Sequence, residues 1–409
     1  MKNPATRRMP GGLSFVFPAG WRWLGLSLAM HCANLLASCS QPTPEKAAPP
    51  TATPQEQVAG ASQQTTIKYA KGFTIQYVGN YKIVKILNPF KDHTDTACYV
   101  LVPRGQSRPA GYGSSSVIET PIRTLVGTSS MHIALADFLN ADDVLVGLGS
   151  LQYASAPAVR KRIAEGKIKA FGENSLNEEQ LIAQHPDLVM TMGSPGAPVE
   201  RFHTLAAAGV PVMVNSEWVE TTPLARAEWV KLLATLLNKE AVVNQKFAKV
   251  EAEYQRLTAL TRRVTKRPQV LTGLPFKDTW YMPDGESYTA QFFRDAGGAY
   301  HWDQERAAGS LALAFEAVYP VALTADCWVN TGTANTKAEI LAQDARYADF
   351  QPFKTGAVYN NNKRTDGHGS NDYWESGAVH PEVILADLIK ILHPELLPQH
   401  ELVYYKQLK

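Results

Sequence analysis

The sequence predicts an α/β protein with two halves, each built on a central sheet flanked by helices, and one long α-helix between them. Strand-like and helix-like segments alternate from Arg123 to Val214 and again after Pro268. Alternation of this kind is typical of parallel sheets covered by helices on both faces. A long amphipathic segment, Glu240–Arg263, separates the two runs. The simpler alternative is a long helix that packs along a single core.

The segment Glu240–Arg263 is predicted to be helical by the spacing of its apolar residues. These residues recur at steps of three or four, which places on one helix face Val243, Phe247, Val250, Tyr254, Leu257 and Leu260. The segment contains no Gly or Pro, its last turns are rich in Lys and Arg, and Pro268 follows it. At about 1.5 Å per residue the helix would be roughly 35 Å long, the width of a small domain.

Length and composition indicate a chain that buries a sizeable core. The 409 residues are 45% hydrophobic, and the length suggests two or three domains. Four of the 40 basic residues and none of the 38 acidic residues lie in the first 39 positions, which leaves 36 basic residues against 38 acidic ones. This balance argues against an electrostatic footprint for nucleic acid.

The N-terminus is typical of an export signal that ends in a lipidated cysteine. A basic lead-in precedes the apolar stretch Leu24–Leu36, which is too short to span a bilayer comfortably. The stretch ends in Leu36-Ala37-Ser38-Cys39, which resembles the bacterial lipobox. An ordinary signal peptide with an incidental Cys is the alternative. We therefore predict a signal peptide over residues 1–39 and a lipid anchor at Cys39, on the periplasmic side of a bacterial membrane.

Two further segments precede the alternating region. Residues 40–65 are rich in Pro, Thr, Ala and Gln without apolar periodicity, which predicts a disordered tether. Residues 66–122 are predicted to be a β-hairpin extension, because alternating apolar residues in Phe73–Tyr77 and Tyr81–Val84 flank Gly79-Asn80, a pair suited to a tight turn. Tyr99–Val102 is a candidate third strand.

Residues 123–239 are the predicted first α/β lobe. Its predicted strands are Arg123–Val126, Val144–Val146, Ile168–Phe171, Leu188–Met192 and Pro211–Val214. Its predicted helices are Met131–Leu139, Ala156–Glu165, Leu176–Gln184, Pro198–Ala208 and Leu224–Leu237. Asn177 or Ser175 is placed to cap the third of these helices. Side chains at the carboxyl ends of such strands are expected to line a cleft.

The connecting helix, residues 240–264, leads to a predicted second α/β lobe over residues 265–409. Its predicted strands are Val270–Leu274, Ala325–Asn330 and Val358–Tyr359. Its predicted helices are Glu286–Ala296, Leu311–Val318, Lys337–Ala342 and Pro381–Leu392. Between the last strand and the last helix, Asn360–Ser376 is predicted to be a polar loop that carries Tyr373 and Trp374.

Several short stretches occur in a recognisable order along the chain: Arg123–Ser130, Ser175–Met192, Gly209–Val214, Leu232–Glu253, Gly297-Gly298 and His393-Pro394-Glu395. Together they resemble the periplasmic binding proteins of ABC importers for ferric siderophores, haem and cobalamin, over roughly Arg123 to Leu396. The resemblance implies two α/β lobes joined by one long rigid α-helix, with a ligand bound between the lobes. The region Thr66–Val102 is extra to that family.

The resemblance also implies a partner and two docking residues. Members of the family dock on an ABC permease, which works with an ATPase, through one Glu on each lobe. The matching positions are Glu179, eight residues before Asp187, and Glu316 within Leu313–Val318. Two separated negative charges would orient and steer docking. The simpler interpretation of both residues is a solvated carboxylate at a helix start.

The ligand is expected at the strand ends between the lobes. Aromatic walls with a few polar anchors suit a large flat ligand, and Arg or Lys suits an anionic ferric chelate. The predicted ligand-binding residues are Ser129, Ser130, Tyr153, Ser194, Trp218, Trp280, Tyr281, Tyr288, Lys363, Arg364, Tyr373 and Trp374. Trp280, Trp374 and Arg364 are the first candidates among them. A core or surface role is the alternative for each aromatic residue, and helix capping is the alternative for the two serines.

The resulting prediction is a monomeric, lipid-anchored substrate-binding protein for an iron-siderophore-type chelate, with no catalytic residue, cofactor or metal site; haem and cobalamin stay open as ligands. A two-lobed extracytoplasmic enzyme is the alternative from another class, but no G-x-S-x-G or P-loop motif is present. A binder of bare metal ions needs converging His and carboxylate ligands. The available histidines are scattered: His132, His203, His301, His368 and His380. Cys98 and Cys327 are either free or paired, and their spacing suits no zinc site.

Overall fold

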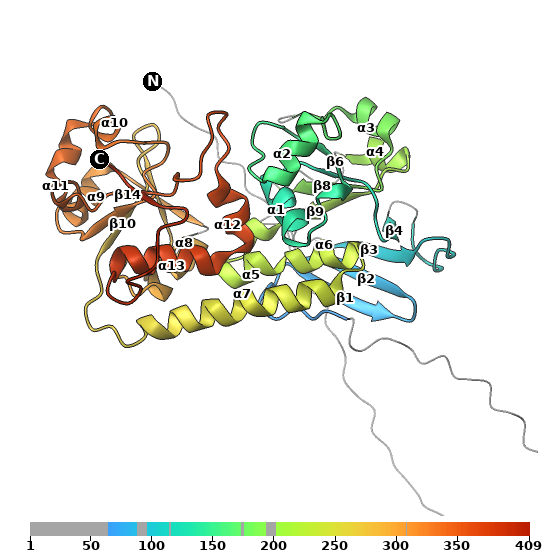
Figure 1. Cartoon of the computed structure of the whole chain (residues 1–409), viewed down its shortest axis with the longest axis horizontal. Helices are drawn as coiled ribbons and strands as arrows, with labels where there is room; N and C mark the ends of the chain where they lie inside the picture. The colour runs from blue at the N-terminus through green and yellow to red at the C-terminus, as the bar shows by residue number, and fades with distance from the viewer. Residues whose placement is uncertain (1–63, 88–95, 114–115, 173–175, 194–201, 308) are drawn as a thin grey trace, which may run out of the picture. The chain divides into compact units, whose positions relative to one another are not determined.

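The computed structural model describes residues 64–409 apart from 88–95, 114–115, 173–175, 194–201 and 308 (Figure 1). All of them belong to the unit that runs from Val58 to Lys409. The predicted signal peptide, most of the predicted tether, Cys39 and Ser194 lie outside the described residues. No helix within the described residues is both long and apolar enough to span a membrane.

The first lobe is built on a five-stranded parallel sheet in the order β7-β6-β5-β8-β9. Its strands are β5 (Leu125–Gly127), β6 (Leu145–Leu148), β7 (Lys169–Ala170), β8 (Leu188–Met192) and β9 (Val212–Asn215). Its helices are α1 (Ser130–Phe138), α2 (Pro157–Ala164), α3 (Glu178–Gln184) and α4 (His203–Ala207), with a 3-10 turn, η2 (Asp142–Val144). The predicted cap of α3 is Asn177, whose side chain accepts from Gln180 N at 3.0 Å. The predicted alternation is confirmed.

A four-stranded sheet precedes the first lobe, in the order β1-β2-β3-β4. Its strands are β1 (Phe73–Val78), β2 (Tyr81–Leu87), β3 (Thr96–Pro103) and β4 (Val117–Thr120). The predicted hairpin is confirmed: Val78 pairs with Tyr81, and Gly79 turns the chain with a φ of 57°. The candidate third strand is confirmed as β3, whereas β4, which pairs parallel to β3, was not predicted.

This N-terminal sheet shares its core with the rest of the molecule. The rings of Phe73 and Trp229 lie 4.7 Å apart, and both side chains belong to a hydrophobic cluster that extends through both lobes. The buried Glu228 carboxylate accepts hydrogen bonds from three consecutive backbone N–H groups, those of Lys68, Tyr69 and Ala70. The segment that leads into β1 is therefore held on the helices that follow the first lobe.

Three helices follow β9 and a 3-10 turn, η4 (Glu217–Val219): α5 (Pro223–Glu228), α6 (Val230–Leu236) and α7 (Glu240–Thr261). The single helix predicted over Leu224–Leu237 is divided at Trp229. The long helix is confirmed as α7, and the apolar face predicted for it is buried at Val243, Phe247, Val250, Tyr254 and Leu257. These residues lie in the cluster that spans both lobes, so α7 is packed along its length. Figure 1 shows α7 beneath α5, α6 and α13 (Pro381–Leu392).

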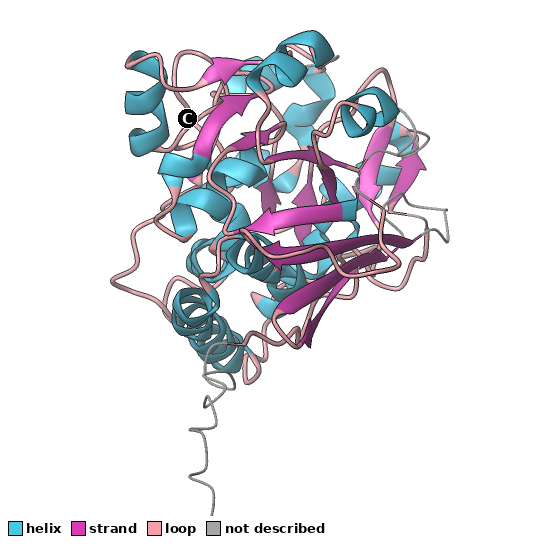
Figure 2. Ribbon diagram, turned by 90° about the vertical axis from the view of Figure 1, so that its right-hand side faces the viewer, coloured by secondary structure: helices cyan, strands magenta, loops and turns pink. Residues whose placement is uncertain are grey.

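The second lobe is assembled from short strands. Strand β10 (Val270–Thr272) pairs in parallel with β13 (Cys327–Val329), and β11 (Trp280–Pro283) pairs antiparallel with β12 (Ser310–Leu313). Strand β14 (Tyr359–Asn360) pairs with β15 (Lys406–Gln407). The other elements are the helices α8 (Tyr288–Asp295), α9 (Phe315–Ala322), α10 (Lys337–Leu341), α11 (Gln351–Thr355) and α12 (Ser376–Val379) and the 3-10 turns η5 (Ala345–Asp349) and η6 (Asp372–Trp374). Figure 2 shows the strands of the molecule lying among its helices.

One predicted element of the second lobe is wrong in type. The stretch Leu311–Val318 was expected to be helical, but its first three residues belong to β12, and α9 begins only at Phe315. Pairing with β11 supplies the hydrogen bonds of Leu311–Leu313, and Ala314 is extended, with φ −75° and ψ 158°. The sequence contains no helix-period signal strong enough to outweigh this long-range pairing. Cys98 and Cys327, whose pairing the sequence leaves open, are both free.

Candidate functional site

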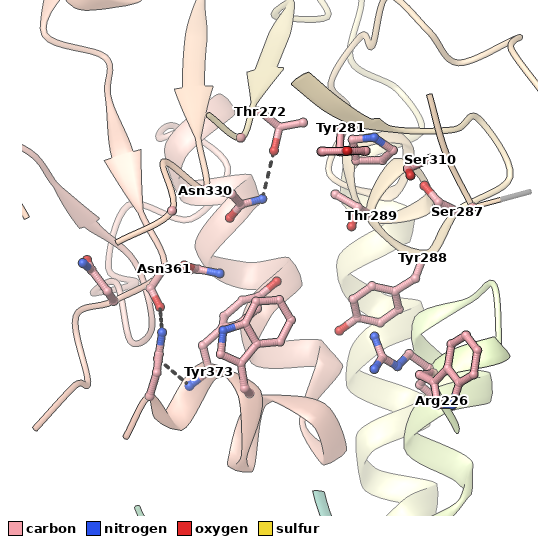
Figure 3. Close-up of a pocket in the computed structure, with 18 of the residues that line it drawn as sticks. Arg226, Thr272, Tyr281, Ser287, Tyr288, Thr289, Ser310, Asn330, Asn361 and Tyr373 are labelled. Atoms are coloured by element: carbon pink, nitrogen blue, oxygen red, sulfur yellow. Dashed lines mark hydrogen bonds between the residues drawn. The ribbon is translucent and has the colours of Figure 1, made fainter. Parts of the chain in front are cut away.

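A cavity of about 1060 Å³ lies between the segment after β9 and the second lobe (Figure 3). The first lobe and α5 contribute Trp218 and Arg226 to its wall. The second lobe contributes the residues that follow β10 and β13, the start of α8 and the loop before α12. The carboxyl ends of neighbouring parallel strands thus open onto the cavity, which is where α/β folds usually bind their ligands.

The first wall carries a guanidinium group whose donors are incompletely used. Arg226 lies on α5, and its Nη2 is 3.8 Å from Oε1 of Glu217, which is longer than a hydrogen bond. Its Nε is buried and has no hydrogen-bond partner among the described residues. Burial raises the pKa of Glu217, an effect that Arg226 opposes. The unpaired Nε–H and the absence of a hydrogen bond to Glu217 leave part of the Arg226 guanidinium unmatched by described partners, which suits an anionic ligand.

Trp218 also lines the cavity and carries a second unpaired donor. Its indole Nε1 is buried and forms no hydrogen bond with any described residue. A buried donor without a partner costs free energy, so a ligand oxygen that accepts from it would gain affinity. Arg226 and Trp218 thus each bring an unpaired N–H group to this wall of the cavity.

The second-lobe floor is rich in amides and hydroxyls, and it also carries the carboxylate residues Asp284, Glu286 and Asp366. Asn330 donates from Nδ2 to Thr272 Oγ1 at 3.2 Å and accepts from the Tyr405 hydroxyl at 2.8 Å. Asn371 donates to the Asn361 carbonyl at 3.2 Å (Figure 3). These bonds fix the loops that follow β13 and β14, so the floor is held in place before a ligand arrives.

Aromatic side chains complete the walls. The rings of Tyr373 and Trp374 are nearly perpendicular, with centroids 4.7 Å apart. Tyr373 is buried, whereas Trp374 is 55% exposed and Tyr281 is 53% exposed. Tyr288 begins α8 behind its cap Ser287, and burial raises the pKa of its hydroxyl. Exposed aromatic faces beside a cavity suit a ligand with flat apolar parts.

Five of the predicted ligand-binding residues line the cavity: Trp218, Tyr281, Tyr288, Tyr373 and Trp374. Ser130 lies beside it, and its hydroxyl donates to the Trp374 carbonyl at 3.4 Å. Tyr153 is 38% exposed and is absent from the lining.

The remaining predicted ligand-binding residues that the structure describes lie elsewhere, and Trp280 is the main correction. It is fully buried against Trp328, Tyr347 and Phe350, and its indole N–H donates to the Thr272 carbonyl at 2.9 Å. The Trp280 ring packs in the second-lobe core. Successive side chains of a strand point to opposite faces, so β11 turns Trp280 inwards and the neighbouring Tyr281 outwards.

Three more of the predicted residues have local partners. Ser129 caps α1, its hydroxyl accepting from Met131 N at 3.2 Å. Arg364 pairs with Asp372 at 2.9 Å, and Lys363 donates to the Leu402 carbonyl. None of the three lines the ligand cavity.

The sequence did not single out Arg226 or the asparagine floor. The apolar spacing of α5 does not distinguish Arg226 from other polar residues of the helix. Its role becomes visible only because it lines the cavity together with residues of the second lobe. The run Asn360-Asn361-Asn362 was a signal that could have been used, because Asn favours turns at strand ends and its amide both donates and accepts hydrogen bonds.

The two predicted docking carboxylates are exposed, one on each lobe. Glu179 lies in the first turn of α3. Glu316 lies in the first turn of α9, with a side chain that is 79% exposed and 3.9 Å from Arg346. An exposed pair at this distance contributes little, so the Glu316 carboxylate stays free for another partner. Among the described residues, no group of three or more His, Cys, Asp or Glu side chains could hold a metal ion.

The two lobes, the long helix and the cavity between them define a solute-binding protein. Residues 134–365 match the family model described as periplasmic binding protein, and the chain belongs to this family. It is 27% identical over 290 residues to the uncharacterized lipoprotein MJ0878 of Methanocaldococcus jannaschii, covering 68% of this chain and 67% of that protein.

Solved structures share the fold. The periplasmic haem-binding protein RhuT from Roseiflexus, in its apo form, matches with a TM-score of 0.53 and 20% identity, over 67% of this chain and 99% of that one. Helicobacter pylori CeuE with nickel(II) bound matches with a TM-score of 0.53 and 17% identity, over 69% of this chain and 88% of that one. These structures confirm the predicted fold class, and the family model confirms the predicted family.

Proposed function

We propose that the protein is the lipid-anchored substrate-binding component of an ABC importer, which captures an iron-siderophore-type chelate between its lobes and delivers it to the permease. The observation that carries the proposal is the pairing of a cavity of about 1060 Å³ with the Arg226 guanidinium at its wall. A cavity of this size suits a ligand larger than a metal ion. An arginine with an unpaired N–H, whose nearest carboxylate lies beyond hydrogen-bond distance, favours an anionic ligand, such as a ferric chelate with catecholate or carboxylate oxygens.

Glu179 and Glu316 would meet basic residues of the permease, one on each lobe, and the protein would act as a monomer without turning over its ligand. Cys39 would hold it at the membrane through a lipid, with the tether of residues 40–65 between anchor and body. Membrane fractionation tests the anchor: wild type is expected in the membrane fraction and Cys39→Ser in the soluble one, and equal partitioning of the two would contradict it.

The ligand is tested by titrating the purified full-length protein with four probes: a ferric tricatecholate, a ferric trihydroxamate, haemin and cyanocobalamin. Trp218 and Trp374 line the cavity, so ligand binding should quench tryptophan fluorescence. We expect saturable binding of the anionic tricatecholate with a Kd in the micromolar range or below. Saturation by haemin or cyanocobalamin alone, or by none of the four probes, would overturn the assignment.

A further inference from the structure

A second cavity, of about 400 Å³, lies beside the ligand cavity, and Thr365 and Asp366 line both. One side is formed by α1 and α2 of the first lobe, the other by the loop of residues 364–376 of the second lobe. Glu375, at the end of this loop, is only 1% exposed. A carboxylate so deeply buried needs partners, and here they come from the opposite lobe.

Glu375 binds the start of α2. Its two oxygens accept from Ser155 N at 2.8 Å and from Ala156 N at 2.6 Å. Ala156 is the residue before α2, where no side chain caps the helix. The Glu375 carboxyl group therefore takes the place of a cap, because its oxygens accept from N–H groups at the helix start that have no partner within the helix. In this role it joins the two lobes.

Two further contacts reinforce this connection. Arg160 of α2 forms an ion pair with Asp366 at 2.5 Å, and Ser130 of the first lobe donates to the Trp374 carbonyl at 3.4 Å. Glu375 directly follows Tyr373 and Trp374, the aromatic pair on the wall of the ligand cavity. A change at Glu375 would therefore be transmitted to that wall through one peptide bond.

We infer that Glu375 is a positioning residue of the ligand cavity: its carboxylate fixes the Tyr373–Trp374 wall to α2, and its protonation state sets how firmly the wall is held. This inference rests on the proposed function, because it assigns a regulated wall to the proposed ligand site. Glu375 itself touches no ligand, and it acts through the two aromatic side chains.

The carboxyl group of Glu375 changes its protonation state near neutral pH. Burial raises its pKa to about 7 from the ordinary value of 4.5, against the lowering effect of the Ser155 and Ala156 N–H groups. The nearby carboxylates Asp372 and Asp137 raise it further. The other charged or titratable groups around the second cavity are Arg160 on α2 and Arg364, Asp366 and His368 on the loop.

The sign of the pH dependence follows from linkage. A Glu375 released into water would return to a pKa near 4.5, so the connected state binds the proton more tightly. The connection is therefore strongest at low pH and weakens as the pH rises through about 7, by up to roughly tenfold per pH unit between these two values. Above that range no further change is expected.

Hydrogen–deuterium exchange of the segment that contains Ser155 and Ala156 tests the connection without a ligand. After correction for intrinsic rates, we expect protection in the wild type to fall about tenfold or more from pH 5.5 to 8. Glu375→Gln, which cannot ionise, should show a flat profile. His368→Asn removes an imidazole from the same cavity and should keep the wild-type profile. A flat wild-type profile, or the same slope in Glu375→Gln, would overturn the inference.

A second measurement tests the effect on the ligand cavity. The ratio of wild-type to Glu375→Gln affinity for the ferric tricatecholate should change with pH in parallel with the exchange data. A constant ratio would show that the connection does not position the wall. If no probe binds at all, the proposed function fails, while the exchange experiment still decides whether Glu375 joins the lobes as inferred.

Discussion

The guanidinium carbon of Arg226 lies 4.5 Å from the ring centroid of Tyr288, so a cation from the helix after the first lobe rests on an aromatic ring of the second. Arg226 is on α5 and Tyr288 begins α8. A cation–π contact of this kind orients the guanidinium without consuming its N–H donors. The geometry leaves these donors free to meet a ligand in the cavity.

Arg226→Gln should weaken binding of the ferric tricatecholate by roughly 10- to 100-fold, because a hydrogen bond to a charged group contributes about 1.5–3 kcal/mol. Titration by fluorescence quenching measures the change. Arg346→Gln is the matched control, since Arg346 is an exposed arginine paired with Asp344 away from the cavity. An Arg226→Gln affinity within twofold of wild type would remove Arg226 from the site.

Trp280 and Trp374 should respond in opposite ways to truncation. Trp280→Ala is expected to lower the free energy of unfolding by about 3–5 kcal/mol, because it empties a fully buried site. Trp374→Ala removes a side chain that is 55% exposed, so stability should change little while chelate affinity falls. Chemical denaturation and the probe titration separate these effects. A Trp374→Ala variant that binds the chelate with the wild-type Kd would show that this residue is not part of the wall of the ligand cavity.

The two exposed carboxylates should act in transport and not in binding. Glu179→Arg and Glu316→Arg, together, are expected to abolish uptake of the chelate by cells and to leave the Kd of the purified protein intact, because reversed charges repel a basic docking surface. Glu401→Arg, at another exposed glutamate, is the control. Uptake at the wild-type rate in the double variant would contradict the docking assignment.

Replacing Glu228 should lower the free energy of unfolding far more than replacing an exposed glutamate. It accepts from three backbone N–H groups and pairs with Lys231 at 2.7 Å, with side chains 0% and 9% exposed. Glu228→Ala leaves the Lys231 charge buried without its partner, so we expect a loss of about 3–5 kcal/mol. Glu253→Ala, which removes an exposed pair with Arg256, should cost about 1 kcal/mol or less. Equal losses in denaturant titrations would refute the role of Glu228 in holding the N-terminal sheet.

The sequence alone determined the parts of this protein that depend on local spacing. The apolar face of α7, the Gly79 turn and the capped α3 were all predicted, because neighbouring residues decide helical and strand periodicity. The short stretches that resemble the binding-protein family, taken in their order along the chain, predicted the two lobes. Five of the predicted ligand-binding residues line the cavity. The sequence could indicate them because they are aromatic residues near predicted strand ends, where a cleft opens in an α/β fold.

Only the tertiary structure decided which residues meet across the molecule. The pairing of β11 with β12 turned Trp280 into the core, although its composition alone suggested a ligand wall. Arg226 reached Tyr288 because α5 and α8 pack together. Glu375 reached Ser155 across 220 positions of the chain. Contacts over such separations depend on how whole elements pack, and no local pattern of residues records that packing.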